Sequence, residues 1–116
     1  MPLLAIRTSA PLPAPADRDA ALLRLSREVA RLLRKPEGYV MVSLEGAAMC
    51  FAGSVEPTCY AELKSIGGIR GATTGGLSQA LCAALEQALG VPQARIYLEF
   101  TDVDGALWGH AGQTFG

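Results

Sequence analysis

The sequence predicts an α+β domain in which one β-α-β unit occurs twice. Two stretches, residues 33–44 and 89–100, resemble each other at an offset of 56 residues. Each stretch ends a helix, turns at a proline and enters a strand. Because a β-α-β crossover is right-handed and makes its two strands parallel, two such units predict a four-stranded sheet with both helices on one face. The 116 residues suffice for a single domain, residues 1–116.

The first unit begins with a predicted strand at residues 2–8. A proline-rich stretch at 11–15 makes the following connection stiff and extended. Asp17 is a candidate cap for the helix, which ends before Pro36. One side of this helix is apolar, and arginines occupy the other side, which we expect to face solvent. The inward residues are Leu22, Leu25, Val29, Leu32 and Leu33, and the arginines are Arg18, Arg24, Arg27, Arg31 and Arg34.

The second unit begins with a predicted strand at residues 59–65, after a turn region at 46–54 that contains a short extra strand. Its helix is expected from about Thr73 to Leu89, with Gly75 and Gly76 near its start. Gly90 suits the left-handed position that follows a helix end. The inward residues of the helix are Leu77, Leu81, Leu85, Ala88 and Leu89.

Apolar residues alternate with other residues in the second strand of each unit. Period-two alternation places Val40, Val42 and Leu44, and likewise Ile96, Leu98 and Phe100, on one sheet face. Tyr97 and Glu99 then point away from the helices, toward a face that a single chain leaves uncovered. Parallel sheets rarely have one face uncovered, and we expect other copies of the chain to cover this face.

Composition excludes several classes of protein. Hydrophobic residues form 50% of the chain, the formal net charge is −1 and only 6% of residues are aromatic. There is no basic excess of the kind that nucleic-acid binding requires. No apolar run reaches the roughly 18 residues that span a bilayer, and no secretory signal is visible. We therefore expect a cytoplasmic protein without nucleic-acid or membrane partners.

Cysteine and histidine offer no metal site. Cys50, Cys59 and Cys82 are odd in number and lack CxxC spacing, which is typical of reduced, mostly buried thiols. His110 is the only histidine, and we assign it no role. One histidine, three scattered cysteines and no clustered carboxylates do not make a ligand set, so we expect neither a metal nor another cofactor.

Pro2 is the candidate catalytic residue. A proline behind the initiator Met1 can become the mature N-terminus, and its nitrogen is then a secondary amine at the end of a buried strand. An α-amino group titrates at about 7.7–8.0, and burial or a nearby cation lowers this pKa. A general base is most effective when its pKa lies near the working pH. Many chains begin with Met-Pro and perform no chemistry, so the remaining residues must support this interpretation.

Three other places are candidates for ligand binding, each with a plainer alternative. Lys35 can anchor a carboxylate, although a cation at a helix C-terminus also stabilises the helix dipole. Glycines after Ser65 allow a ligand to reach a backbone N–H, although an ordinary loop also needs them. Trp108 and Phe115 lie in a glycine-rich tail at 105–116, where they can line a pocket mouth or pack against a neighbouring subunit.

Several short motifs together resemble one family. They are Pro2 after Met1, Lys35-Pro36 with Tyr39, Glu56-Pro57, Ser65-Ile66-Gly67, Arg95-Ile96-Tyr97, Asp102 and Thr114-Phe115. In this order and at these spacings they are similar to the macrophage migration inhibitory factor family of the tautomerase superfamily, and the resemblance covers essentially the whole chain.

The resemblance implies a homotrimer with active sites between subunits and keto–enol tautomerase activity on phenylpyruvate-type 2-oxo acids. It also allows isomerase activity of the dopachrome type. By position, Pro2 is then the catalytic base, Lys35 binds the substrate carboxylate and Ile66 offers its backbone N–H. Tyr97 comes from the neighbouring subunit, and Glu99, Trp108 and Phe115 complete the substrate-binding set.

The sequence departs from the family's better-known animal members at several positions. Thr58 and Ala61 stand where those members carry a CxxC, so thiol-oxidoreductase activity is not expected. Glu99 replaces an Asn, and His110 stands where a Trp is usual. These changes predict altered substrate preference at the pocket mouth.

Two other functions stay open at this point. The chain can be a trimeric, cytokine-like binding or signalling protein with a vestigial pocket. It can also be a superfamily relative that uses the same proline for dehalogenation or hydration, although the additional acid, base and cationic groups of such relatives are not identifiable here.

Overall fold

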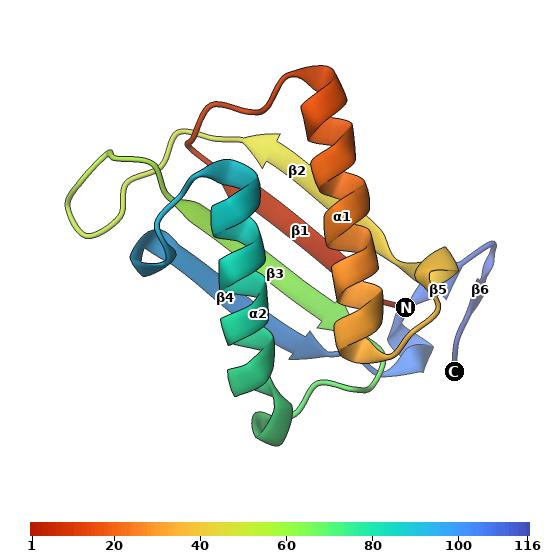
Figure 1. Ribbon diagram of the computed structural model, residues 1–116. Helices are drawn as coiled ribbons and strands as arrows, with labels where there is room; N and C mark the ends of the chain where they lie inside the picture. The colour runs from red at the N-terminus through yellow and green to blue at the C-terminus, as the bar shows by residue number, and fades with distance from the viewer.

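In the computed structural model, which describes residues 1–116, two helices cover one face of a four-stranded sheet (Figure 1). The strand order is β2-β1-β3-β4, with parallel outer pairs and an antiparallel central pair, β1 and β3. The elements are β1 (Leu3–Thr8), α1 (Pro15–Leu33), β2 (Met41–Gly46), β3 (Cys59–Ser65), α2 (Gly71–Leu89) and β4 (Ile96–Asp102). The predicted α+β fold with two β-α-β units is confirmed.

The 56-residue repeat is present in the backbone itself. Helix α2 begins and ends 56 residues after α1, and the 3-10 turns Glu37–Tyr39 and Gln93–Arg95 keep the same offset. Both helices end at a residue in the left-handed conformation, Arg34 and Gly90. A proline two residues later prevents either helix from continuing.

The helix starts differ from the prediction. Asp17 does not cap α1, because the helix already begins at Pro15, a residue suited to the first helical position, and Asp17 lies within the first turn. A carboxylate there still interacts favourably with the helix dipole. Helix α2 begins at Gly71, two residues before the predicted start, so Gly75 and Gly76 lie inside it.

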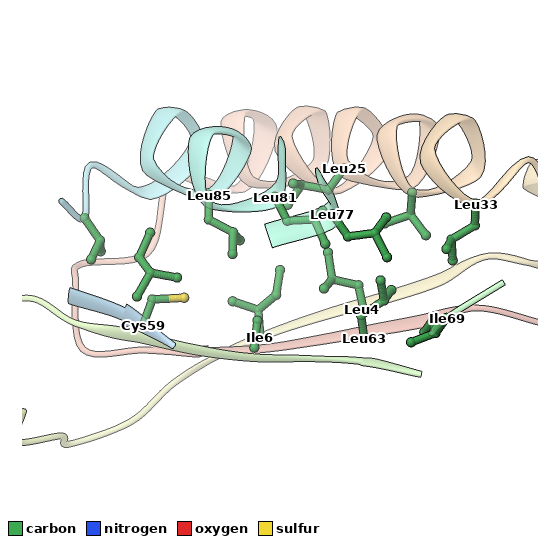
Figure 2. Packing of buried hydrophobic residues seen from close by; sticks show 14 of the residues in the cluster. Leu4, Ile6, Leu25, Leu33, Cys59, Leu63, Ile69, Leu77, Leu81 and Leu85 are labelled. Carbon is green, nitrogen blue, oxygen red and sulfur yellow. The ribbon is translucent and has the colours of Figure 1, made fainter. Parts of the chain in front are cut away.

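The core lies between the helices and the sheet. Figure 2 shows Leu4, Ile6 and Leu63 of the central strands pointing toward the leucines of α1 and α2. Burying a leucine contributes about 1.5–3 kcal/mol, so this one layer supplies much of the stability. The predicted strand residues join it, with Ile96 buried and Val40, Val42, Leu44, Leu98 and Phe100 packed against the cluster.

The other face of the sheet is polar. Arg7 and Glu45 pair at 2.7 Å, Lys64 lies 3.7 Å from Glu62, and Thr101 donates a hydrogen bond to Glu99. Because the central strand pair is antiparallel, one solvated face is compatible with this sheet. A subunit that covers this face meets these charges together with the exposed side chains of Met41 and Tyr97.

Two connecting segments differ from the sequence-based expectation. Residues 47–58 hold only an isolated bridge between Phe51 and Ser54, not an extra strand. The glycine-rich tail is ordered, with a 3-10 turn at Gly105–Leu107 and a hairpin of β5 (Gly109–His110) and β6 (Gln113–Thr114). Figure 1 places this hairpin beside the N-terminus. Neither helix combines the length and apolar character that crossing a bilayer requires.

Candidate active site

A cavity of about 390 Å³ opens where the N-terminus meets the C-terminal hairpin. Three segments far apart in the sequence form it: the chain start leading into β1, the turn before β2 with the first residue of β2, and residues 108–110 with β5. Its lining residues are Met1, Pro2, Leu3, Gly38, Tyr39, Val40, Met41, Trp108, Gly109 and His110. The cavity therefore brings together two of the predicted site residues, Pro2 and Trp108.

Pro2 directly precedes β1 and continues its pairing. Its carbonyl accepts a hydrogen bond from the Met41 N–H at 3.0 Å, and its side chain is fully buried. The pKa of the Met1 amino group lies below its ordinary value, chiefly because burial disfavours the charged form and secondly because Lys35 is close. This end of the chain thus favours a neutral amine.

Lys35 follows the left-handed residue that ends α1, and its side chain reaches across to the turn after β3. There its Nζ donates a hydrogen bond to the Ile66 carbonyl at 2.8 Å. A Cβ on Gly67 would lie 3.9 Å from this Nζ, and Gly67 has a φ of +75°, which favours glycine. The Gly67 N–H donates to Asp102 Oδ1 at 2.8 Å, which fixes the turn to the end of β4.

Ile66 therefore contributes to the site through its carbonyl, which accepts the hydrogen bond that holds Lys35 in place. The predicted ligand contact through the Ile66 backbone N–H stays a prediction. Lys35 itself does not line the cavity, but its ammonium group remains close enough to lower the pKa of the terminal amine. A carboxylate placed between the amine and Lys35 would meet a cation with spare hydrogen-bond donors.

The C-terminal hairpin and the residues that flank it hold three aromatic rings, Trp108, His110 and Phe115. Trp108 lines the cavity and a second, more open hollow beside Lys64. Phe115 does not line it; its ring packs against His110 with centroids 5.7 Å apart. His110 does line it, at the position where the family's better-known animal members usually carry a Trp.

Tyr97 and Glu99 lie away from this cavity within one chain. Tyr97 pairs with Tyr60 at the opposite end of the sheet, where its side chain is 62% exposed and contacts Phe51 edge-on at 4.8 Å. Glu99 lies on the polar face beside Thr101. Both point away from the helices, as predicted, and their contact with a neighbouring subunit's site stays a prediction.

The remaining hollows and the thiols hold no comparable chemistry. A hollow of about 320 Å³ between the helices is lined by four alanines and by Arg24, Leu25, Glu28 and Gln87. Its one carboxylate, Glu28, accepts two hydrogen bonds from Arg31. Burial, with the nearby Cys82, raises the pKa of the Cys59 thiol to about 11, so little of it is the reactive thiolate at neutral pH. No group of three metal-ligating side chains comes together in the structure.

Comparison with known proteins identifies the family. The model of the family described as macrophage migration inhibitory factor (MIF) matches residues 1–116. The chain belongs to this family. A macrophage migration inhibitory factor homolog of Brugia malayi is 35% identical to it over 117 residues, covering all of both chains. The family includes tautomerase enzymes, and its members form homotrimers.

Solved structures of the family have the same fold. The chain matches a macrophage migration inhibitory factor homologue from Prochlorococcus marinus with a TM-score of 0.91 and 49% identity, covering 98% of this chain and 99% of that one. Macrophage migration inhibitory factor of Toxoplasma gondii matches with a TM-score of 0.89 and 38% identity, covering 97% and 99%. The β-α-β arrangement described above is thus that of the MIF family.

Proposed function

We propose that the protein is a keto–enol tautomerase for phenylpyruvate-type 2-oxo acids, with the Pro2 nitrogen as the general base once Met1 is removed. The observation that carries the proposal is the cavity at the chain N-terminus, where Pro2 is buried and where partial burial and Lys35 both lower the pKa of the adjacent Met1 amine. Such an amine is a base suited to neutral pH without a metal or another cofactor.

The reaction is a proton transfer between carbon and oxygen. The neutral Pro2 nitrogen takes a proton from C3 of the keto acid, and the C–H bonding electrons move toward the carbonyl. The carbonyl oxygen gains a proton from water to give the enol, and protonated Pro2 releases its own proton to water. In the reverse sense, protonated Pro2 returns the proton to C3. Lys35 holds the carboxylate, the Ile66 N–H binds a substrate oxygen, and Trp108 provides an apolar wall for the aromatic ring.

The proposed site is complete only in a homotrimer. Tyr97 lies at the far end of its own sheet and is exposed there, whereas Glu99 lies in the middle of β4 and is partly exposed. In the proposal, Tyr97 of one subunit lines the cavity of the next and Glu99 lies at its border. Phe115 contributes indirectly, because its ring packs against His110 and holds it at the cavity mouth.

The test compares Pro2→Gly with a control proline. Mass spectrometry first establishes that Met1 is absent from the wild type and from both variants. We expect Pro2→Gly to lower kcat/KM for phenylpyruvate tautomerisation by about 100-fold or more, the range of a general base. Pro11→Ala, at an exposed proline in the connection to α1, should retain the wild-type rate. A Pro2→Gly protein with the wild-type rate would rule out Pro2 as the base.

A further inference from the structure

Ser65, at the end of β3, is a buried hydroxyl without a partner. Its side chain is fully buried, at 0% exposure, and its Oγ is the only buried side-chain polar atom in the structure that forms no hydrogen bond. The other buried hydroxyls are paired: Thr8 donates to the Thr58 carbonyl at 2.8 Å, and Thr58 donates to the Arg95 carbonyl at 2.7 Å. An unpaired buried hydroxyl is unfavourable compared with alanine, so this serine needs an explanation.

The strand register places Ser65 against Pro2. In the antiparallel pairing of β1 with β3, Leu4 faces Leu63 and Leu3 faces Lys64. One further step along the ladder brings Pro2 opposite Ser65. Both residues belong to the buried, helix-facing series of their strands.

Backbone hydrogen bonds indicate which kind of cross-strand pair this is. The Ser65 carbonyl accepts from the Val103 N–H, on the β4 side, and the Pro2 carbonyl accepts from the Met41 N–H, on the β2 side. Neither carbonyl points at the other residue's strand, so the two form a non-hydrogen-bonded pair. In such pairs the Cα atoms are about 4.5 Å apart and the side chains are in closest contact. The Ser65 hydroxyl therefore lies against the proline ring.

We propose that Ser65 Oγ is the hydrogen-bond acceptor for the Pro2 amine once Met1 is gone, and that it orients the lone pair of this amine. The inference rests on the proposed function, because it concerns the same base. While Met1 is attached, the Pro2 nitrogen is a tertiary amide with no hydrogen to donate. After Met1 is removed, the neutral amine has one N–H and one lone pair.

An N–H held by Ser65 leaves the lone pair directed toward the cavity. When the substrate C–H bond breaks, this lone pair forms the new N–H bond, and the C–H electrons move toward the substrate carbonyl. The first N–H stays on Ser65, and the serine keeps its own proton throughout. Ser65 is thus a positioning residue. Its oxygen also favours the protonated amine, because it accepts a hydrogen bond from the charged form.

Three other titratable groups lie near the same nitrogen: Lys35 after α1, and Tyr39 and His110, which line the cavity with Pro2. On the neighbouring strand ends, Lys64 points to the polar face beside Glu62, and Asp102 accepts from the Gly67 N–H. All of them remain in a Ser65→Ala variant, so a change in the titration of the amine reports the hydroxyl alone.

The experiment uses Met1-free wild type, Ser65→Ala and Ser65→Thr, with three readouts: NMR titration of the labelled Pro2 nitrogen, the pH profile of phenylpyruvate tautomerisation, and chemical unfolding. We expect Ser65→Ala to lower the pKa of the amine by about half to one unit. It should also reduce kcat about tenfold, with KM within about twofold, the pattern of lost positioning. Its stability should equal or exceed that of the wild type. Ser65→Thr, which keeps the hydroxyl, should restore the pKa and kcat.

Two outcomes would overturn the inference. In the first, Ser65→Ala keeps the wild-type pKa and kcat, which would show that the hydroxyl is only structural or binds a water molecule. In the second, Ser65→Thr folds normally but has the same lowered pKa and kcat as Ser65→Ala. If the wild type turns over no 2-oxo acid, the proposed function fails. The NMR titration of Ser65→Ala, which needs no substrate, still decides whether Ser65 bonds the amine.

Discussion

Lys35 has two electrostatic effects at the chain N-terminus. Its ammonium group lowers the pKa of the terminal amine, and in the proposed mechanism it also holds the substrate carboxylate. These effects act on different kinetic parameters, because the first controls the fraction of neutral base and the second controls binding. One substitution therefore separates them.

We expect Lys35→Met to raise KM for phenylpyruvate by roughly 10- to 100-fold, the worth of a hydrogen bond to a charged group. Because the like-charge repulsion disappears, the pKa of the amine rises, and the acidic limb of the kcat/KM profile moves to higher pH. Steady-state rates between pH 5 and 9 measure both changes. Lys64→Met is the matched control, because Lys64 pairs with Glu62 on the polar face, and it should change KM less than threefold. Equal effects of both variants would contradict the assignment of Lys35.

The lowered pKa also links stability to pH. In the chain that retains Met1, the folded Met1 amine has a pKa below its ordinary value of 8.0, so it binds fewer protons than the amine of the unfolded chain. The free energy of unfolding therefore rises as the pH increases through the folded pKa toward 8. Lys35→Met, which brings the two pKa values closer, should make this rise smaller.

Single residues were predictable to different degrees. Pro2 and Lys35 carry local signals, a proline behind the initiator and a cation after a helix. His110 gives no such signal, because its place in the cavity depends on a hairpin turn at Ala111 and Gly112, both with positive φ. The Ala-Gly pair is weaker turn chemistry than Asn-Gly. The unpaired state of Ser65 is a three-dimensional property that no sequence pattern contains.

Among the segments between regular elements, residues 47–58 are held mainly by one side chain. The Arg95 guanidinium donates hydrogen bonds to the carbonyls of Phe51, Ser54, Glu56 and Pro57 at 2.9–3.3 Å. It also lies 5.2 Å from the centre of the Phe51 ring, whose edge-on partner is Tyr97. Arg95 thereby connects this loop to the exposed tyrosine that the proposed trimer uses.

We expect Arg95→Gln to lower the free energy of unfolding by about 2–3 kcal/mol, because several charge-assisted hydrogen bonds are lost together. The loop at 47–58 should also become sensitive to limited proteolysis. Arg27→Gln is the matched control, since Arg27 is exposed on α1 and forms no side-chain hydrogen bond, and we expect a change within about 0.5 kcal/mol. Identical denaturation curves for the two variants would mean that Arg95 does not hold the loop.

The regular elements were predictable because their signals are local. Leucines at helical spacing and alternating valines placed both helices and all four main strands within a few residues. The loop at 47–58 and the C-terminal hairpin were not, because contacts distant in sequence fix them: Arg95 reaches back about 40 positions, and the Phe115 N–H donates to the Gly105 carbonyl. The start of α1 was misplaced because Pro15 outweighs a capping aspartate.

At the scale of the whole molecule, the proposed active site needs residues from two subunits, because one chain does not bring them together. Pro2 and Tyr97 lie at opposite ends of the sheet. If each active site combines Pro2 of one subunit with Tyr97 of the next, two inactive variants should complement each other. Pro2→Gly and Tyr97→Ala each damage a different half of the site.

We expect co-refolded mixtures of Pro2→Gly and Tyr97→Ala to recover activity that neither variant has alone. In randomly mixed trimers, about one quarter of the sites regain both residues. Native mass spectrometry measures the mixed trimers, and the tautomerisation rate measures recovery. Refolding each variant alone is the control. Mixed trimers without recovered activity would contradict a site shared in this way.

The internal repeat has one more consequence. The counterparts of Pro2 and Lys35 in the second unit, 56 residues on, are Thr58 and Val91, both buried. Thr58 sits mid-chain with its nitrogen locked in a peptide linkage, so it can never become an amine. A duplicated β-α-β unit therefore does not give a second catalytic amine, because the chain has only one N-terminus. Two separate half-length chains would each have a terminal nitrogen of this kind. In the fused chain only the first unit has one, so the second unit contributes packing rather than a second base.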